Sequence, residues 1–400
     1  MSSFPYDLLR RWPDVEAPDL FAIDGADRLL LAEIDAALDG YGPAPLTELV
    51  VVGDTHGALT LGVLRSDEPT GITRVRVHQD ARSGELALEN NATALAGALA
   101  FVAHEAEKPH ASAHFVHCAL DAALVTDAHL VVLRLPHSLE QLDQWAALIA
   151  AYAADDVFVL AGGRIKHMTH SMNEVLARYF DTVQASLAEQ KSRVLRASGP
   201  KRAEALEALG GYPKTKHHPQ QDLTVCAEGG VFAGINVDIG TRAMLEVLEQ
   251  IPVAPGQRVI DFGCGTGIFA AMLARMHPTA TIIASDQSAA AVASAEATMA
   301  ANGLADSVSV VRDDGLSQQP NASADVIVFN PPFHSGAAVH SDTSLRLFAE
   351  AGRVLKPGGE LWIVANRHLG YKAALRKLVG ETTEVHHTQK FTVTRSIKGA

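Results

Sequence analysis

The chain has 400 residues, of which 48% are hydrophobic and 20% are charged, so its composition is that of a globular protein and its length favours two domains. The formal net charge of −13 argues against a protein coated in nucleic acid, because phosphate binding depends on lysine and arginine. Three cysteines, Cys118, Cys226 and Cys264, form no CxxC pair, which disfavours a disulfide framework and a thiolate zinc site.

The N-terminal residues 1–19 contain no apolar stretch typical of signal peptides, and no part of the chain has 18 consecutive uncharged apolar residues. We therefore expect a soluble cytoplasmic protein without a membrane segment. The charge is uneven, since residues 191–218 carry seven basic and two acidic side chains, and residues 360–400 carry seven and three. A basic surface that binds RNA is one interpretation of these segments, and solvated surface charge is an equally good one.

Four segments of the first half resemble four segments of the second half, in the same order and at offsets near 200 residues. The pairs are residues 49–59 with 258–268, 128–138 with 324–335, 157–168 with 361–371, and 191–198 with 390–397. Chance likeness among strands could produce one or two such matches, but four in one order indicate an internal duplication.

Residues 198–224 are rich in glycine, proline and lysine, which is typical of a linker between domains. This places one domain at residues 1–197 and a second at residues 225–400.

The second half alternates apolar strand patterns with helix patterns. We expect strands at 258–263, 281–286, 308–314, 324–330 and 360–367, and helices at 268–277, 288–303 and near 342–355, the last stopped by Lys356-Pro357-Gly358-Gly359. Such alternation predicts an α/β fold with a doubly wound parallel sheet, covered by helices on both faces.

A glycine loop follows the first strand of the second half. Its residues are Asp261, Gly263, Cys264, Gly265, Thr266 and Gly267, in the pattern D-x-G-x-G-x-G. Glycines allow close approach of a ligand to the backbone, although a tight turn alone would explain them. The spacing differs from the G-x-G-x-x-G that binds a pyrophosphate, and the acid at its start suits a cation such as an α-ammonium group.

Further acids follow the next two strands. Asp286, with Gln287 beside it, ends the second strand, where a carboxylate can accept both hydroxyls of a ribose. Asp313 and Asp314 end the third strand, and either could accept from an adenine amino group. An ammonium, a ribose and an adenine without phosphate describe S-adenosylmethionine.

The strand at 324–330 ends at Asn330, and a turn of Pro331, Pro332 and Phe333 follows it. A Pro-Pro turn lacks N–H groups, so together with the amide oxygen of Asn330 it offers acceptors to an exocyclic amino group, and Phe333 offers a face on which a base can stack. An ordinary loop is the alternative. The acceptors favour attack by the amine lone pair on a methyl group, without a catalytic histidine or another strong base.

The glycine loop, Asp286 and the Asn330–Phe333 turn resemble those of class I methyltransferases. Nearly the whole chain is similar to bacterial ribosomal RNA (guanine-N2)-methyltransferases of the RsmC/RlmG type, through VFAGINVDIGTR (231–242), VIDFGCGTG, FNPPFH (329–334), IVANRHLGY (363–371) and KFTV (390–393). The N-terminal FPYDLLRRWP and GDTHGAL are closer to the large-subunit branch.

This resemblance implies two tandem methyltransferase-like domains, with S-adenosylmethionine as cofactor and ribosomal RNA or a ribosomal subunit as partner. It also implies that Phe232 and Asp238 lie near the cofactor. His334, Arg367 and His368 would contact the substrate, although a solvated or capping role explains them equally well.

The first copy has lost the residues of the cofactor site. Val51 stands where Asp261 stands, Thr55 matches Gly265, and Arg134-Leu135-Pro136 replaces Asn330–Phe333, while Asp80 is a candidate relic of the ribose-binding acid. The resemblance assigns this half to folding support or RNA binding.

Three other functions stay open from the residues alone. N-P-P-[FY] turns also serve methylation of a release-factor glutamine and of adenine N6, and a binding module could retain cofactor affinity without catalysis. We expect a monomer, and we expect no metal site, because His114 and His117, the last histidines of the cluster at 104–118, would face opposite sides of a strand.

Overall fold

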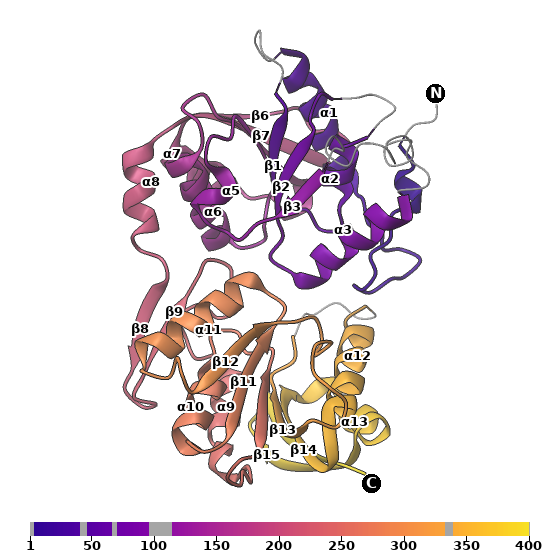
Figure 1. Cartoon of the computed structure of the whole chain (residues 1–400), viewed down its shortest axis with the longest axis vertical. Helices are drawn as coiled ribbons and strands as arrows, with labels where there is room; N and C mark the ends of the chain where they lie inside the picture. Colours follow the sequence, from indigo (N-terminus) through magenta and orange to yellow (C-terminus); the bar gives the residue numbers. More distant parts are fainter. Residues whose placement is uncertain (1–3, 41–45, 66–69, 96–113, 333–338, 400) are drawn as a thin grey trace, which may run out of the picture. The chain divides into compact units, whose positions relative to one another are not determined.

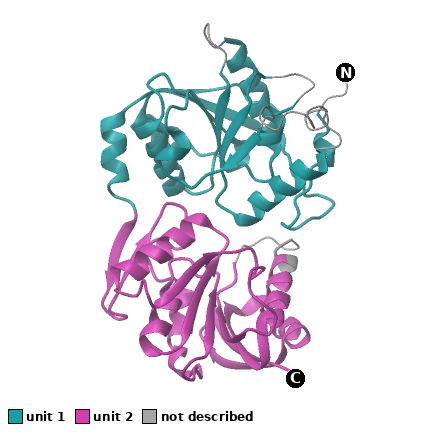
Figure 2. Ribbon diagram, in the orientation of Figure 1, with its two compact units in different colours: residues 1–212 teal, residues 213–400 magenta. Residues whose placement is uncertain are grey.

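The structure, a computed structural model, describes residues 4–40, 46–65, 70–95, 114–332 and 339–399. The chain divides into two compact units, residues 1–212 and 213–400 (Figure 2). Each unit contains a seven-stranded sheet, and the strand orders, β3-β2-β1-β4-β5-β7-β6 and β12-β11-β10-β13-β14-β16-β15, are the same. The predicted α/β class and internal duplication are therefore confirmed.

In the first unit the strands are β1 (Glu48–Val52), β2 (Arg74–His78), β3 (His114–His117), β4 (Leu130–Arg134), β5 (Phe158–Arg164), β6 (Phe180–Ala185) and β7 (Ser192–Pro200). Its α-helices are α1 (Gly25–Gly40), α2 (Ala58–Val63), α3 (Arg82–Leu95), α5 (Ala122–Val125), α6 (Leu139–Tyr152), α7 (His170–Tyr179) and α8 (Arg202–Leu209).

In the second unit the main sheet contains β10 (Arg258–Phe262), β11 (Thr281–Asp286), β12 (Val308–Arg312), β13 (Ala324–Phe329), β14 (Leu355–Asn366), β15 (Gly380–His387) and β16 (Phe391–Lys398). The helices are α9 (Ile239–Leu245), α10 (Ile268–Met276), α11 (Ala289–Ala301), α12 (Val339–Val354) and α13 (Lys372–Leu378), and β8 (Lys214–His218) pairs with β9 (Leu223–Ala227) in a hairpin.

Both faces of the central strands β10 and β13 are buried, which explains the apolar runs Val259-Ile260 and Val326–Phe329. Val259 and Val328 pack on the side of α9, α10 and α11, whereas Ile260, Ile327 and Phe329 pack on the side of α12 and α13 (Figure 1). The strands β10 to β14 are parallel, so their carboxyl ends lie at one edge of the sheet.

The segment 198–224, expected to be a linker, is largely built into the two units. Its first residues end β7, α8 packs through Ala205 on the core of the first unit, and β8–β9 belongs to the second unit. The boundary falls within it, between Tyr212 and Pro213. Of the lysines that suggested a linker, Lys201 precedes α8, and Lys214 and Lys216 belong to β8.

The stretch Lys356–Gly359 also differs from expectation. It follows α12 as predicted, but it is an excursion inside β14 rather than a loop before it, because pairing with β13 resumes after a register shift, from Leu355 opposite Ala324 to Glu360 opposite Val326. Sequence patterns do not reveal such bulges, since the pairing partner determines them.

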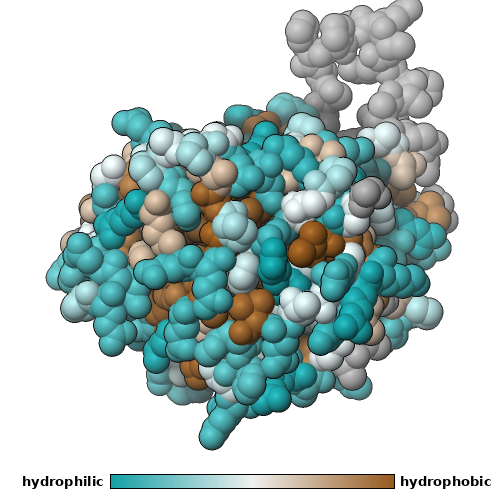
Figure 3. Space-filling view, turned by 90° about the horizontal axis from the view of Figure 1, so that it is seen from below, coloured by the Kyte–Doolittle hydropathy of each residue, from teal (hydrophilic) through white to brown (hydrophobic). Residues whose placement is uncertain are grey.

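No helix in the described ranges combines the length and apolar character needed to cross a bilayer. On the face drawn in Figure 3, hydrophilic residues predominate and hydrophobic ones occur in small separate groups.

Candidate active site

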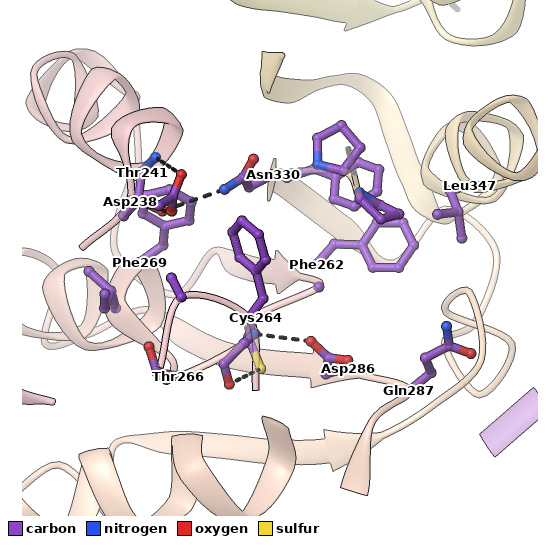
Figure 4. Close-up of a pocket in the computed structure, with 18 of the residues that line it drawn as sticks. Asp238, Thr241, Phe262, Cys264, Thr266, Phe269, Asp286, Gln287, Asn330 and Leu347 are labelled. Atoms are coloured by element: carbon purple, nitrogen blue, oxygen red, sulfur yellow. Dashed lines mark hydrogen bonds between the residues drawn. The ribbon is translucent and has the colours of Figure 1, made fainter. Parts of the chain in front are cut away.

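A pocket in the second unit lies at the carboxyl ends of β10, β11, β12 and β13 (Figure 4). Ligands of open α/β sheets bind at this edge, because the loops that leave the strands diverge there. The predicted site residues that line the pocket are Phe232, Asp238, Gly263, Cys264, Gly265, Thr266, Asp286, Gln287, Asp313, Asp314, Asn330, Pro331 and Pro332.

The glycine loop turns sharply against the end of β11. Gly263, Gly265 and Gly267 have φ values of 65°, 53° and 78°, in the left-handed region that favours glycine. The amides of Gly263 and Cys264 donate to the carbonyl oxygen of Ser285, over 2.8 and 3.0 Å. Burial, followed by the nearby carboxylates, raises the pKa of Cys264 well above its usual value, so this thiol stays protonated.

Asp286 is oriented by the loop that it supports. Its Oδ2 accepts from the amide of Gly265 at 3.0 Å, and its Oδ1 accepts from the amide of Ser288 at 3.0 Å. These two contacts hold the carboxylate at the pocket wall beside Gln287 (Figure 4).

Asp313 and Asp314 are both buried, and both have protein partners. Asp313 accepts from the hydroxyl of Ser317 at 2.6 Å and from the amide of Gln318 at 3.0 Å. Asp314 forms a two-pronged ion pair with Arg346 of α12, at 2.9 and 3.1 Å. The guanidinium of Arg346 thereby becomes part of the pocket wall.

Asp261 lies behind the loop rather than at the pocket surface. Alternation along β10 turns its side chain toward α10, where the amide of Ala270 donates to Oδ2 at 2.9 Å. The side chain is fully buried, and Oδ1 has no hydrogen-bond partner in the described part of the chain. Burial, with a smaller contribution from the charge of Asp286, raises the pKa of Asp261 to about 7. Gly267 likewise lies outside the pocket lining, at the start of α10.

Asn330 follows β13 and meets the start of α9. Its Nδ2 donates to Thr241 Oγ1 at 3.4 Å, and Thr241 Oγ1 in turn donates to Asp238 Oδ2. Asp238 caps α9 by accepting from the amides of Gly240 and Thr241. The side-chain oxygen of Asn330 is buried and has no hydrogen-bond partner among the described residues.

The remaining predicted residues are placed differently. Phe333 and His334 lie outside the described residues. Arg367 and His368 are exposed on a short 3-10 helix (Arg367–Leu369) directly after β14, at the same sheet edge but outside the pocket lining. Phe232 is 61% exposed at the pocket mouth.

Comparisons with known proteins agree with this architecture. The family model "RLMG N-terminal domain" matches residues 6–201, and the model "Methyltransferase small domain" matches residues 222–395. Ribosomal RNA large subunit methyltransferase G of Stutzerimonas stutzeri is 33% identical over 393 residues, which cover 98% of this chain and 97% of the relative. The Streptomyces avermitilis protein of the same name is 32% identical over 411 residues, covering 98% and 96%.

The chain belongs to the ribosomal RNA large subunit methyltransferase G family. The resemblance inferred from the sequence is confirmed, and so is S-adenosylmethionine as the cofactor. The fold is shared with the solved structure "T. Thermophilus 16S rRNA N2 G1207 methyltransferase (RsmC) in complex with AdoMet and Guanosine", which is 20% identical, has a TM-score of 0.70, and aligns over 96% of this chain and 97% of that one.

The pocket fits the cofactor of the methyltransferase G family. No atom lies within 4 Å of the position where a Cβ on Gly265 would be, so the loop leaves space for a ligand against its backbone. Acidic side chains line the wall at the ends of β11 and β12, where a phosphate would be repelled but hydroxyl and amino groups can donate. The buried, unpartnered oxygen of Asn330 adds an acceptor at the other end.

Thr241 and Arg346 are among the pocket residues that sequence reasoning missed. Thr241 belongs to the VFAGINVDIGTR motif, but the motif alone does not assign it a function. Its position three residues after Asp238, which caps the helix, is the sequence pattern that indicates a contact between the two. Arg346 has no such signal, because an arginine on an amphipathic helix is typical of a solvated face.

Proposed function

We propose that this protein transfers a methyl group from S-adenosylmethionine to the N2 amine of a guanine in ribosomal RNA. The observation that carries the proposal is the side-chain oxygen of Asn330, a buried acceptor without a partner in the described residues, in the pocket that also contains the glycine loop. The relatives are named ribosomal RNA methyltransferases. The solved structure that shares the fold is named an N2 G1207 methyltransferase in complex with guanosine.

In this proposal Asp286 accepts the ribose hydroxyls, Asp313 and Asp314 lie at the adenine, and Phe232 and Asp238 border the methionine part. The backbone of residues 263–267 supports the ligand, and Asp261 stabilises the loop from behind through Ala270. When bound, S-adenosylmethionine supplies an electrophilic methyl group.

The substrate amine is a poor nucleophile, because its lone pair is delocalised into the purine ring. Asn330 Oδ1 and the carbonyl of Pro331 accept its two hydrogens, so the lone pair is directed at the carbon that it attacks. Positioning and exclusion of water then provide most of the rate enhancement. The amine proton becomes acidic only as the N–C bond forms and the methyl–sulfur bond breaks, and it is then released to solvent, so no strong base is required. Phe333 stacks on the base in the same proposal.

We assign RNA contacts to an exposed basic surface around the end of β14. It consists of Arg367, His368, Lys372, Arg376, Lys377 and Lys390. The amide of Arg367 donates to the carbonyl of Lys390, so the short helix and the β15–β16 turn lie together. A local group of basic side chains at this edge is compatible with RNA binding by a chain whose net charge is −13.

The second unit is the catalytic domain in this proposal, and the first unit provides structural support or RNA binding. The protein acts as a monomer and without a metal. Among the described residues, no group of three or more His, Cys, Asp or Glu side chains is arranged to hold a metal ion.

Incubation with methyl-labelled cofactor tests the proposal. Unmodified large-subunit RNA, the assembled subunit and a release factor are offered separately, and nucleoside analysis identifies the product. We expect N2-methylguanosine in the RNA arms. Label in a glutamine or in adenine N6 would refute the guanine assignment, and tight cofactor binding without transfer in any arm would favour a binding module.

A further inference from the structure

Three side chains form a chain of hydrogen bonds that ends at the predicted catalytic amide. Asp238 precedes α9, Thr241 lies in the first turn of that helix, and Asn330 follows β13. The Thr241 hydroxyl contacts the Asp238 carboxylate on one side and the Asn330 amide on the other (Figure 4).

The chemistry of these groups fixes the direction of each bond. An ionised carboxylate can only accept hydrogen bonds. The Thr241 hydroxyl therefore uses its single hydrogen to donate to Asp238. The oxygen of Thr241 is then left with lone pairs, and it can only accept from Asn330. Of the two ends of the Asn330 amide, the NH2 end must therefore face Thr241. With the amide reversed, two acceptors would face each other without a proton between them.

The orientation of the amide decides what the pocket offers. With the nitrogen held by Thr241, Asn330 Oδ1 is turned away from it, as a buried acceptor without a partner in the described part of the chain (Figure 4). We propose that Asp238 and Thr241 are positioning residues, which hold the Asn330 amide with its oxygen toward the substrate amine. This inference rests on the proposed function, because it presumes that the substrate donates a hydrogen at this point.

The first unit contains the same three-way contact with different chemistry. Val132 of β4 lies opposite Val51, as Val328 of β13 lies opposite Asp261, so Arg134 occupies the position of Asn330. Asp24 accepts from the amides two and three residues later, as Asp238 does, so Asp27 occupies the position of Thr241.

Arg134 donates to both Asp24 and Asp27, at distances of 2.7 to 2.9 Å. A guanidinium has no acceptor, so this copy keeps the contact, but Arg134, unlike Asn330, cannot itself accept a hydrogen from an amine. In both units the start of a helix meets the end of a strand, although the side chains at the contact differ. The residue types there determine which groups donate and which accept. The second unit combines an acceptor-only acid, a hydroxyl and an amide, the set that leaves an oxygen available.

The test compares the affinities of guanosine and inosine, which lacks the 2-amino group, by competition NMR with S-adenosylhomocysteine present. In the wild-type protein we expect guanosine to bind about fivefold or more tightly, the factor expected for one net hydrogen bond. In Thr241→Val this ratio should fall toward one, and Thr241→Ser should regain most of it. Thr241→Ala provides a second variant, and Thr224→Val on the β8–β9 hairpin is the matched control.

Two further measurements separate positioning from damage to the fold. Thr241→Val should lower the single-turnover rate on RNA about tenfold or more, while the cofactor Kd from calorimetry changes less than about twofold. General damage would weaken guanosine and inosine equally and would also weaken the cofactor.

The outcomes distinguish the two proposals. A wild-type protein that prefers guanosine, together with valine and alanine variants that keep the full preference, would overturn the positioning role and leave the proposed function intact. A wild-type protein that does not distinguish the two nucleosides would overturn the guanine-amine assignment, and the positioning role with it.

Discussion

The backbone amide of Ala270, in the first turn of α10, donates a 2.9 Å hydrogen bond to the carboxylate of Asp261 at the end of β10. A carboxylate near a helix N-terminus stabilises the exposed amides there, but this one is fully buried and its other oxygen has no partner among the described residues. The acid that begins the glycine loop therefore contacts the structure on the buried side of the loop.

Replacement of Asp261 should change the pH dependence of stability. Its pKa in the folded protein is about 7, against 3.8 in a model carboxyl, so the folded protein retains a proton that the unfolded chain releases between these values. Rising pH over this interval thus favours unfolding. The free energy of unfolding of Asp261→Asn, relative to wild type, should rise between about pH 4 and pH 7 by at most about 4 kcal/mol. Urea denaturation at a series of pH values measures this, and parallel curves for the two proteins would contradict it.

Gly265 and Gly267 should differ in their response to alanine. A Cβ on Gly267 would lie 2.9 Å from Met299 Cε and 3.1 Å from Ala295 Cβ, so Gly267→Ala should lower the free energy of unfolding by about 2 kcal/mol or more. Gly265→Ala should lower the free energy of unfolding by only about 1 kcal/mol, the cost of a left-handed backbone conformation for alanine. It should, however, weaken cofactor binding, because Gly265 lines the pocket.

Gly303→Ala is the matched control for these glycines, because Gly303 also has a positive φ, of 67°, with no atom near the added Cβ. It should share the backbone cost and leave the cofactor Kd unchanged. Equal loss of cofactor affinity in all three variants would show that stability alone explains the effect.

Arg346 should support the pocket through Asp314. Arg346→Ala leaves a carboxylate that is 5% exposed without its ion-pair partner, so we expect a loss of about 1–3 kcal/mol in the free energy of unfolding and about tenfold weaker cofactor binding. Calorimetry and chemical denaturation measure the two quantities. Arg376→Ala on the exposed face of α13 should change neither, and an unchanged cofactor Kd in Arg346→Ala would remove Arg346 from the site.

The basic surface after β14 should determine the salt dependence of RNA binding. Each phosphate contact contributes about 0.7–0.9 to the slope of log K against log salt, so Arg367→Ala combined with Lys390→Ala should lower the magnitude of the slope by about 1.4–1.8. Lys356→Ala is the control, since this lysine pairs with Asp325 at the opposite edge of the sheet. An unchanged slope in the double variant would place the RNA elsewhere.

The strands and helices that frame the pocket could be predicted because their local pattern is strong. β10, β11 and β13 each contain a run of apolar residues, and glycine, aspartate or asparagine follows that run where each strand meets the pocket. The duplication was visible for the same reason, since both copies keep this pattern.

What the sequence did not show depends on contacts between distant segments. The contact of Asp261 with Ala270 of α10 turns this carboxyl, a predicted cofactor ligand, away from the pocket lining. The roles of Thr241 and Arg346 exist only because α9 and α12 lie beside β13 and β12. In the first unit, strand register places Gln79 at the position of Asp286, so Asp80 is not the relic of the ribose-binding acid.

The excursion at Lys356–Gly359 offers a place to attach a reporter. It interrupts β14 near the amino-terminal end of the strands, whereas the pocket lies at their carboxyl ends. Gly358 has a φ of 75° and no atom within 4 Å of an added Cβ, so the chain there has room. A fluorescent label or affinity tag inserted at this position would be carried by the second unit and would leave the entrance of its pocket unobstructed.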